Sequence, residues 1–319
     1  MSVNPLVQEQ ESAPRGAVAV IGAGVIGQSW ATLYAAQGYS VTVQDPRPDL
    51  AEALDASLAE WLPQVAGAVD DPARARARVR VAATVEEAVT GVRAVQEAGP
   101  ETVDFKRDLW PRVEAAAPAE ALLLSSSSGI VASAQAAGMT DRTRLVIGHP
   151  FNPPHVLPLV EVSAAPGTPQ QRIDGALDFY REVGKYPVQL HRESPGFVAN
   201  RLQMALVMEA IRLVRAGVVD VRELDDIVTH SLGIRWATIG PLLAFHLGGG
   251  PGGLGHLLEH IGRGLATDIG QQLSDEDITA VGQAAAEAYP YDRFPAYRQT
   301  RDALQSAIIA ERDAHPLQP

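Results

Sequence analysis

The chain has 319 residues, which is long for a single hydrophobic core, so we expect two domains. Its 46% hydrophobic and 20% charged residues are typical of a globular protein with a packed core. The formal net charge of -12 argues against a general nucleic-acid binder, which needs basic surface to displace counterions from phosphates. A negative net charge does not exclude an anionic small ligand, because binding depends on the local electrostatic field of the site more than on the net charge of the chain.

The sequence contains no cysteine, which excludes disulfides, a thiol nucleophile and a Cys-ligated metal site. We take this as favouring a reducing, cytoplasmic setting. Residues 1–15 are polar, predict a flexible tail and lack the apolar stretch of a signal peptide. No apolar run is long enough for a membrane span, so we expect no membrane partner.

Short apolar runs alternate with longer helical ones from residue 16 onward, a pattern typical of α/β architecture. A strand at 17–21, a helix to residue 37, a strand at 40–44 and a helix at 49–62 come first. Further strands are expected at 94–96, 122–125, 145–148, 159–162 and 187–191, and further helices at 169–183 and 197–216. Because strand signals cease near residues 192–196, we expect an α/β domain at 16–192 and an all-helical domain at 193–319.

A glycine-rich turn, Gly22-Ala23-Gly24-Val25-Ile26-Gly27, follows the first strand and opens the first helix. Its glycines permit a tight turn and close approach of a pyrophosphate, which the helix N-terminus attracts. Asp45 ends the next strand, roughly 20 residues on, where a carboxylate binds the adenosine ribose and repels a 2′-phosphate. Nearby Arg47 instead favours that phosphate. We expect a Rossmann-type, doubly wound, mainly parallel sheet that binds NAD through Gly22, Gly24, Val25, Ile26, Gly27 and Asp45.

Other polar motifs follow later strands. They are the serine run 125–128, His149 within G-H-P-F-N-P-P, Glu161 within L-V-E-V and the segment S-P-G-F-V-A-N-R at 194–201. A histidine at the carboxyl end of a parallel strand lies where open α/β sheets bind ligands. Its imidazole can accept the proton of an alcohol if a carboxylate fixes its tautomer, and Glu161 is the candidate carboxylate. The alternative is that both residues are merely structural.

With these motifs in this order, the chain resembles the 3-hydroxyacyl-CoA dehydrogenase family from Ala17 to beyond Gly255. Segments such as 224–228 and 233–241 are more similar to its L-gulonate 3-dehydrogenase (lambda-crystallin-like) and carnitine dehydrogenase branch. The resemblance implies a homodimer and an NAD-dependent oxidation of a 3-hydroxyl group. It also implies site residues, namely His149 as general base, Glu161 as its partner, Ser128 and Asn200 at the substrate oxygen, and Glu97 and Lys106 near the cofactor. For Glu97 a loop cap, and for Lys106 a solvated helix charge, are the structural alternatives.

The substrate is left open between two classes. The chain reads H-P-F-N-P where acyl-CoA enzymes usually read H-F-F-N-P, and the segment after Asp45 is short, which disfavours CoA. We therefore favour a free 3-hydroxycarboxylate resembling gulonate, carnitine or 3-hydroxybutyrate, with Arg235 as candidate carboxylate clamp. A structural role for Arg235 is nearly as well supported. The alternatives are a 3-hydroxyacyl group on CoA or a carrier protein and, more remotely, a non-catalytic NAD-binding crystallin-like protein.

A competing motif lies in the helical region. His256-Leu257-Leu258-Glu259-His260 fits H-x-x-E-H, the pattern of one class of zinc peptidases. Since no third ligand is evident in the sequence, we expect no metal site and a packing role for these side chains.

Overall fold

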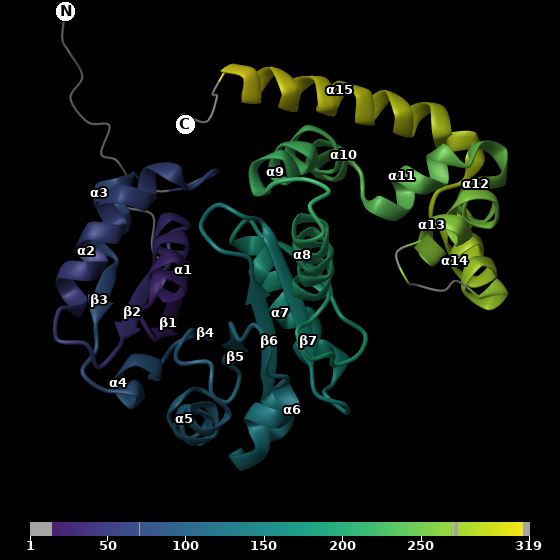
Figure 1. The fold of residues 1–319 in the computed structure, drawn as a ribbon. Coiled ribbons are helices and arrows are strands. Elements are labelled where there is room, and N and C mark those ends of the chain that lie inside the picture. Colours follow the sequence, from purple (N-terminus) through teal and green to yellow (C-terminus); the bar gives the residue numbers. More distant parts are fainter. Residues whose placement is uncertain (1–14, 70, 269, 271–273, 315–319) are drawn as a thin grey trace, which may run out of the picture. The chain divides into compact units, whose positions relative to one another are not determined.

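The computed structural model of the chain describes residues 15–69, 71–268, 270 and 274–314 (Figure 1). By their contacts the residues group into two units, Met1–Ala205 and Leu206–Pro319, and each unit is considered by itself. This grouping reflects contacts within the folded chain and does not test the domain boundary expected near residue 192, which stays a prediction. Most of the expected tail lies outside the described residues. Among those described, no helix has the length and apolar character needed to cross a membrane.

One eight-stranded sheet forms the centre of the first unit, with strand order β3-β2-β1-β4-β5-β6-β7-β8. All neighbouring pairs are parallel except β6 and β7, which confirms the expected mainly parallel, doubly wound sheet. The strands are β1 Ala17–Ile21, β2 Ser40–Gln44, β3 Val79–Val81, β4 Ala94–Glu97, β5 Leu122–Ser125, β6 Leu145–Pro150, β7 Leu159–Ala164 and β8 Tyr186–Gln189. The chain order reverses between β1 and β4, and open α/β sheets bind ligands at such a switch point.

Helices cover both faces of this sheet. They are α1 Val25–Ala36, α2 Leu50–Trp61, α3 Pro72–Ala77, α4 Val85–Val89, α5 Val103–Ala116, α6 Ala132–Gln135 and α7 Gln170–Glu182. On one face Trp30 and Tyr34 of α1 pack with Phe179 and Tyr180 of α7. Residues of α4, α5 and α6 form a second buried cluster, which includes Trp110, against the other face. These two layers fix the carboxyl ends of the strands, where the polar motifs lie.

The second unit is helical, as the sequence predicts, and α8 begins before it. Its elements are α8 Ala199–Arg215, α9 Val221–His230, α10 Leu232–Thr238, α11 Pro241–Gly248, α12 Gly253–Leu257, α13 Arg263–Asp268, α14 Asp275–Ala288 and α15 Phe294–Ala314. A small core of Ile239, Leu243, Leu247 and Phe294 holds α10, α11 and α15 together. Beside it, the buried His246 ring accepts from the N–H of Leu254 and contacts the Tyr289 carbonyl.

Candidate active site

The glycine turn after β1 is built for close approach of another group. A side chain at Gly22, whose φ is +93°, would lie 2.7 Å from the backbone of residues 98 and 99. One at Gly27 would lie 1.9 Å from the Gly22 oxygen, whereas Gly24 faces open space. Gly24 is also the N-cap of α1, and no side chain caps that helix. The first N–H groups of α1 therefore stay available to an anion such as the pyrophosphate of NAD, and the turn fits that cofactor.

Asp45 lies beside this turn, at the end of β2. Its carboxylate accepts hydrogen bonds from the N–H of Ala23 at 2.7 Å and of Arg47 at 3.0 Å. It also lines a cavity of about 560 Å³, hereafter the Asp45 cavity, together with Gly22. The Arg47 guanidinium is held by both carboxylate oxygens of Asp49, at 2.7 Å each. This arrangement suits an unphosphorylated adenosine ribose, because the nearest cation already has a carboxylate partner.

His149 and Glu161 face each other across the antiparallel pair β6 and β7, in direct register. His149 Nδ1 lies 2.9 Å from Glu161 Oε2, and both residues are buried. Burial raises the pKa of Glu161, but hydrogen bonds from His149 and from the Ala199 and Val198 N–H groups bring that pKa below its ordinary value. An ionised carboxylate can only accept, so Nδ1 carries the proton and the opposite nitrogen, Nε2, keeps a lone pair.

Glu161 also anchors the start of α8. Its other oxygen, Oε1, accepts from the N–H groups of Val198 and Ala199, at 3.0 Å each. The turn before α8 is tight: Gly196 and Phe197 have φ of +75° and +49°, and the Phe197 ring lies 5.1 Å from the His149 ring. A single carboxylate thus positions both the histidine and the helix that carries Asn200.

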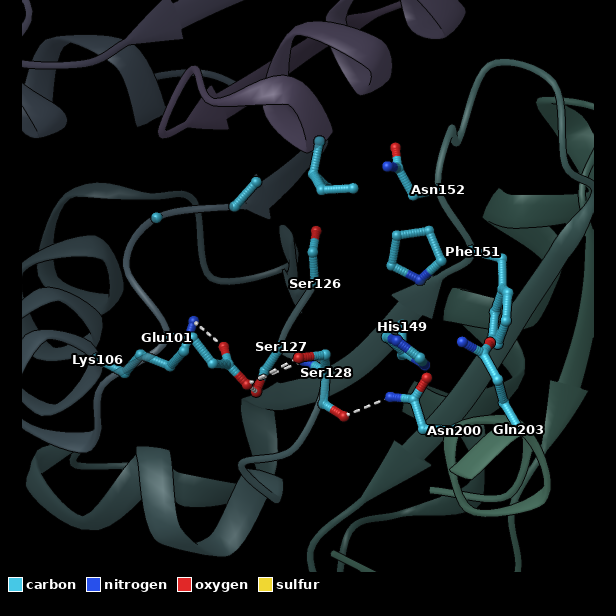
Figure 2. Close-up of a pocket in the computed structure, with 14 residues that line it drawn as sticks. Glu101, Lys106, Ser126, Ser127, Ser128, His149, Phe151, Asn152, Asn200 and Gln203 are labelled. Atoms are coloured by element: carbon cyan, nitrogen blue, oxygen red, sulfur yellow. Dashed lines mark hydrogen bonds and ion pairs between the residues drawn. The ribbon is translucent and has the colours of Figure 1, made fainter. Parts of the chain in front are cut away.

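The serine run leaves β5 and wraps around the carboxylate of Glu101. Glu101 Oε1 accepts from the Ser127 hydroxyl at 2.6 Å and from the N–H groups of Ser128 and Gly129 at 3.0 and 2.9 Å. Burial raises the pKa of Glu101, and these bonds together with the Lys106 charge lower it below its ordinary value. Asn200 Nδ2 donates to the Ser128 carbonyl at 2.9 Å, which joins α8 to the serine run (Figure 2).

Glu97 and Lys106 form a buried ion pair. Lys106 Nζ lies 2.9 Å from each Glu97 carboxylate oxygen, and neither side chain is more than 1% exposed. Glu97 also accepts from Ser125 Oγ and the Gly99 N–H, both at 2.7 Å. Contact of Glu97 with the cofactor stays a prediction. Lys106, which lies 3.4 Å from Glu101 as well, is the member of the pair that reaches the cavity described next.

Several predicted residues come together around one cavity of about 450 Å³, hereafter the His149 cavity. Its wall includes Ile26, Lys106, Ser128, His149 and Asn200 (Figure 2). Gly99 lines both this cavity and the Asp45 cavity, so the two adjoin along the switch point. Other residues of the wall were not predicted from the sequence as site residues, among them Glu101, Ser126, Ser127, Phe151, Asn152 and Gln203. The only sequence signal for Glu101 was a second acid shortly after β4.

Arg235 belongs to the second unit, on α10. It is exposed and, with Phe245 and Arg301, lines a cavity of about 470 Å³ formed by residues of that unit alone. Its role as carboxylate clamp stays a prediction. The rings of His256 and His260 lie 4.1 Å apart, and in the part of the chain that the structure describes no three potential metal ligands gather.

The comparisons with known proteins agree over most of the chain. The family model for the NAD binding domain of 3-hydroxyacyl-CoA dehydrogenase matches residues 17–194, and the model for its C-terminal domain matches residues 196–283. An L-carnitine dehydrogenase of Streptomyces griseus is 44% identical over 276 residues, 84% of this chain and 82% of that protein. A 3-hydroxyacyl-CoA dehydrogenase of Gibberella moniliformis is 40% identical over 304 residues, 92% and 94% of the two chains.

Solved structures share the fold. A 5-formyl-3-hydroxy-2-methylpyridine 4-carboxylic acid 5-dehydrogenase, an NAD+ dependent dismutase, aligns with a TM-score of 0.69 at 25% identity, over 90% of this chain and 98% of that one. A 3-hydroxyacyl-CoA dehydrogenase from Archaeoglobus fulgidus aligns with a TM-score of 0.62 at 24% identity, over 86% and 99%. The chain therefore belongs to the 3-hydroxyacyl-CoA dehydrogenase family and is an NAD-dependent dehydrogenase.

Proposed function

We propose that this enzyme oxidises the 3-hydroxyl group of a small free 3-hydroxycarboxylate, with L-carnitine as the first candidate, and that His149 is the general base. The observation that carries the proposal is the buried His149–Glu161 pair, with 2.9 Å between Nδ1 and Oε2, beside a cavity that Ser128 and Asn200 also line. The L-carnitine dehydrogenase of Streptomyces griseus, 44% identical, supports this substrate class.

The residues of the His149 cavity suit a proton transfer coupled to hydride loss. His149 Nε2 takes the hydroxyl proton while the hydride leaves carbon 3 and the carbonyl forms, and Glu161 stabilises the resulting imidazolium. Bound NAD supplies the acceptor for that hydride. Ser128 Oγ and the amide of Asn200 hold the substrate oxygen near His149. Acid–base catalysis of this kind contributes about 10²–10⁴-fold to the rate.

The charge of the cavity favours a substrate that carries a cation. Glu101 on the wall and Glu97 buried behind it share the ammonium group of Lys106, which leaves an excess of negative charge beside the cavity. Phe151 adds an aromatic ring to the wall, and aromatic faces attract quaternary ammonium groups. For the carboxylate of the substrate we propose Arg235 as partner, since guanidinium groups bind carboxylates through two parallel hydrogen bonds.

A CoA thioester is the second candidate, because a relative named 3-hydroxyacyl-CoA dehydrogenase is 40% identical over most of both chains. A panel of L-carnitine, L-gulonate, 3-hydroxybutyrate and 3-hydroxybutyryl-CoA, followed by NADH absorbance, decides between them. We expect the highest kcat/KM for L-carnitine. The His149→Gln variant is the control, because it must lose activity on whichever substrate is used. Preference for the thioester contradicts the substrate assignment, and full activity of His149→Gln contradicts the mechanism.

We also propose that the enzyme is a cytoplasmic homodimer whose second copy covers α8. Met204, Val207, Met208 and Ile211 recur at helical spacing along α8, and each is 39–57% exposed in the single chain. Contiguous exposed apolar stripes of this kind mark protein interfaces. Light scattering coupled to size exclusion should give twice the 33.9 kDa chain mass. A Met208→Glu variant should then elute as a monomer, and a monomeric wild-type protein contradicts the proposal.

A further inference from the structure

Ser126, the first residue after β5, has a hydroxyl group whose two lone pairs are both occupied. Gln96 Nε2 donates to Ser126 Oγ at 2.8 Å, and Trp30 Nε1 donates to it at 3.1 Å. A serine hydroxyl offers one hydrogen and two lone pairs. With both lone pairs taken, Ser126 can act toward a further group only as a donor.

The orientation of the Gln96 amide, on which this depends, is set by two buried phenols. Tyr34 and Tyr180 are fully buried, and each hydroxyl lies 2.9 Å from Gln96 Oε1. Burial raises the pKa of both phenols, so each keeps its hydrogen and needs an acceptor. Turning the amide around would bring its NH₂ group to both phenols and leave two buried hydrogens without an acceptor, which costs free energy. The amide oxygen therefore faces the tyrosines and the NH₂ group faces Ser126.

Ser126 borders the His149 cavity, so its hydroxyl hydrogen is available to a group bound there. Ser126 is only partly buried and lines that cavity, and in Figure 2 its oxygen points away from Ser127 and Ser128. Among the described residues no acceptor takes its hydrogen. Its neighbours differ from those of Ser128, whose carbonyl accepts a hydrogen bond from Asn200.

We propose that Ser126 orients the nicotinamide ring of NAD by donating its hydroxyl hydrogen to the carboxamide oxygen. The inference rests on the proposed function in one respect, namely that the nicotinamide lies in the His149 cavity. Ile26, Gly99 and Ser126 all line the His149 cavity. Ile26 belongs to the glycine turn and Gly99 also borders the Asp45 cavity, so a dinucleotide that spans both cavities passes these residues. The carboxamide oxygen is the acceptor that the nicotinamide ring offers to a donor-only hydroxyl. Tyr34, Tyr180 and Gln96 do not contact the cofactor in this proposal. Their buried hydrogen bonds orient the Ser126 hydroxyl, so they are positioning residues.

Binding in the absence of substrate tests this without relying on turnover. Calorimetric Kd values are measured for NAD, for its thionicotinamide analogue, whose sulfur is a weak acceptor, and for ADP-ribose, which lacks the ring. Ser126→Ala should raise the Kd for NAD roughly fivefold and change the Kd for ADP-ribose by less than about twofold. The Kd for the thio-analogue should rise less than that for NAD. Ser126→Thr keeps the hydroxyl and should restore NAD affinity. Ser133→Ala, an exposed serine on α6, is the matched control and should change none of the three.

The outcomes separate the inference from the proposed function. Unchanged NAD affinity in Ser126→Ala, or equal losses for NAD and ADP-ribose, overturns the role of Ser126. If Ser126→Ala fails to fold, wild-type protein alone decides, because it should bind NAD several-fold more tightly than the thio-analogue, and equal affinities overturn the proposal. Wild-type protein that binds ADP-ribose but not NAD contradicts instead the placement of the nicotinamide.

Discussion

Replacing Glu161 by glutamine should reverse the polarity of the His149 ring. The introduced amide can keep its oxygen toward the N–H groups of Val198 and Ala199, which lie 3.0 Å from Glu161 Oε1 in the wild-type protein. Its NH₂ group then faces His149 Nδ1, so Nδ1 must accept and the proton moves to Nε2. The lone pair that we propose as acceptor of the substrate proton is lost. We therefore expect Glu161→Gln to reduce kcat by about 10²–10⁴-fold, the usual contribution of a general base.

The same substitution should also lower stability. Glu161 is 3% exposed, so its hydrogen bonds are little weakened by water. Two of them, from Val198 and Ala199, change from charged to neutral acceptors, and charge-assisted bonds exceed neutral ones by about 1 kcal/mol each. The free energy of unfolding should thus fall by about 2 kcal/mol.

The pH dependence of this loss provides a further check. The pKa of Glu161 is lower in the folded protein than its ordinary value of 4.5, which the unfolded chain keeps. The unfolded chain therefore binds more protons in acid, and the stabilisation is present above about pH 4.5 and is lost as pH falls through the folded-state pKa. Glutamine does not titrate, so the difference in stability between wild type and Glu161→Gln should shrink in acid.

Single-turnover NADH formation and urea unfolding near neutral pH and about pH 4 measure these effects. Glu182→Gln is the matched control, because Glu182 is half-exposed in an ion pair with Arg93 outside the His149 cavity. Exposed pairs contribute about 0–1 kcal/mol, so this control should keep its kcat and nearly all its stability. Turnover of Glu161→Gln within about threefold of wild type would refute the assignment of Glu161 as the group that fixes the His149 tautomer.

Three further substitutions follow from the remaining contacts. Asp45→Ala should weaken NAD binding and reduce the preference for NAD over NADP, because it removes the carboxylate that we propose binds the ribose and the acceptor for the Ala23 N–H; equal use of NADP and NAD by the wild-type enzyme would contradict this. Arg235→Met should raise the KM for L-carnitine by the equivalent of about 2–5 kcal/mol and leave the KM for a CoA thioester unchanged. Steady-state kinetics with both substrates measures this difference. Lys106→Met leaves the buried Glu97 charge unpaired and should cost about 3–5 kcal/mol in thermal unfolding, and an unchanged Tm would count against that pairing.

The sequence was enough to predict which residues meet where they belong to neighbouring elements of the chain. The glycine turn and Asp45 are separated by one helix and one strand, so their meeting follows from a single β-α-β unit. His149 and Glu161 were also predictable as partners, because only a short connection joins β6 to β7. The direct register between them, and the antiparallel direction of β7, came only from the structure.

Tertiary structure decided which polar groups reach the His149 cavity. Glu97 is the last residue of β4 and Glu101 follows shortly after it, yet Glu97 is enclosed by Lys106 and Ser125 while Glu101 lines the cavity. Nothing in the local sequence separates the two, since their environments depend on α5 and β5 packing against β4. Sequence alone could therefore propose Glu97 for the cofactor but had no means of choosing Glu101.

Ser126 illustrates the same limit more strongly. The sequence determined that three serines, Ser126 to Ser128, follow β5, and the family resemblance directed attention to Ser128. That Ser126 can only donate follows from Trp30 on α1 and from Gln96, which is held in turn by Tyr180 from α7, 84 residues away along the chain. Hydrogen-bond roles of this kind are set by which buried donors and acceptors must satisfy one another. Local sequence dictates the elements that carry those groups, and only the packed layers bring them within bonding distance.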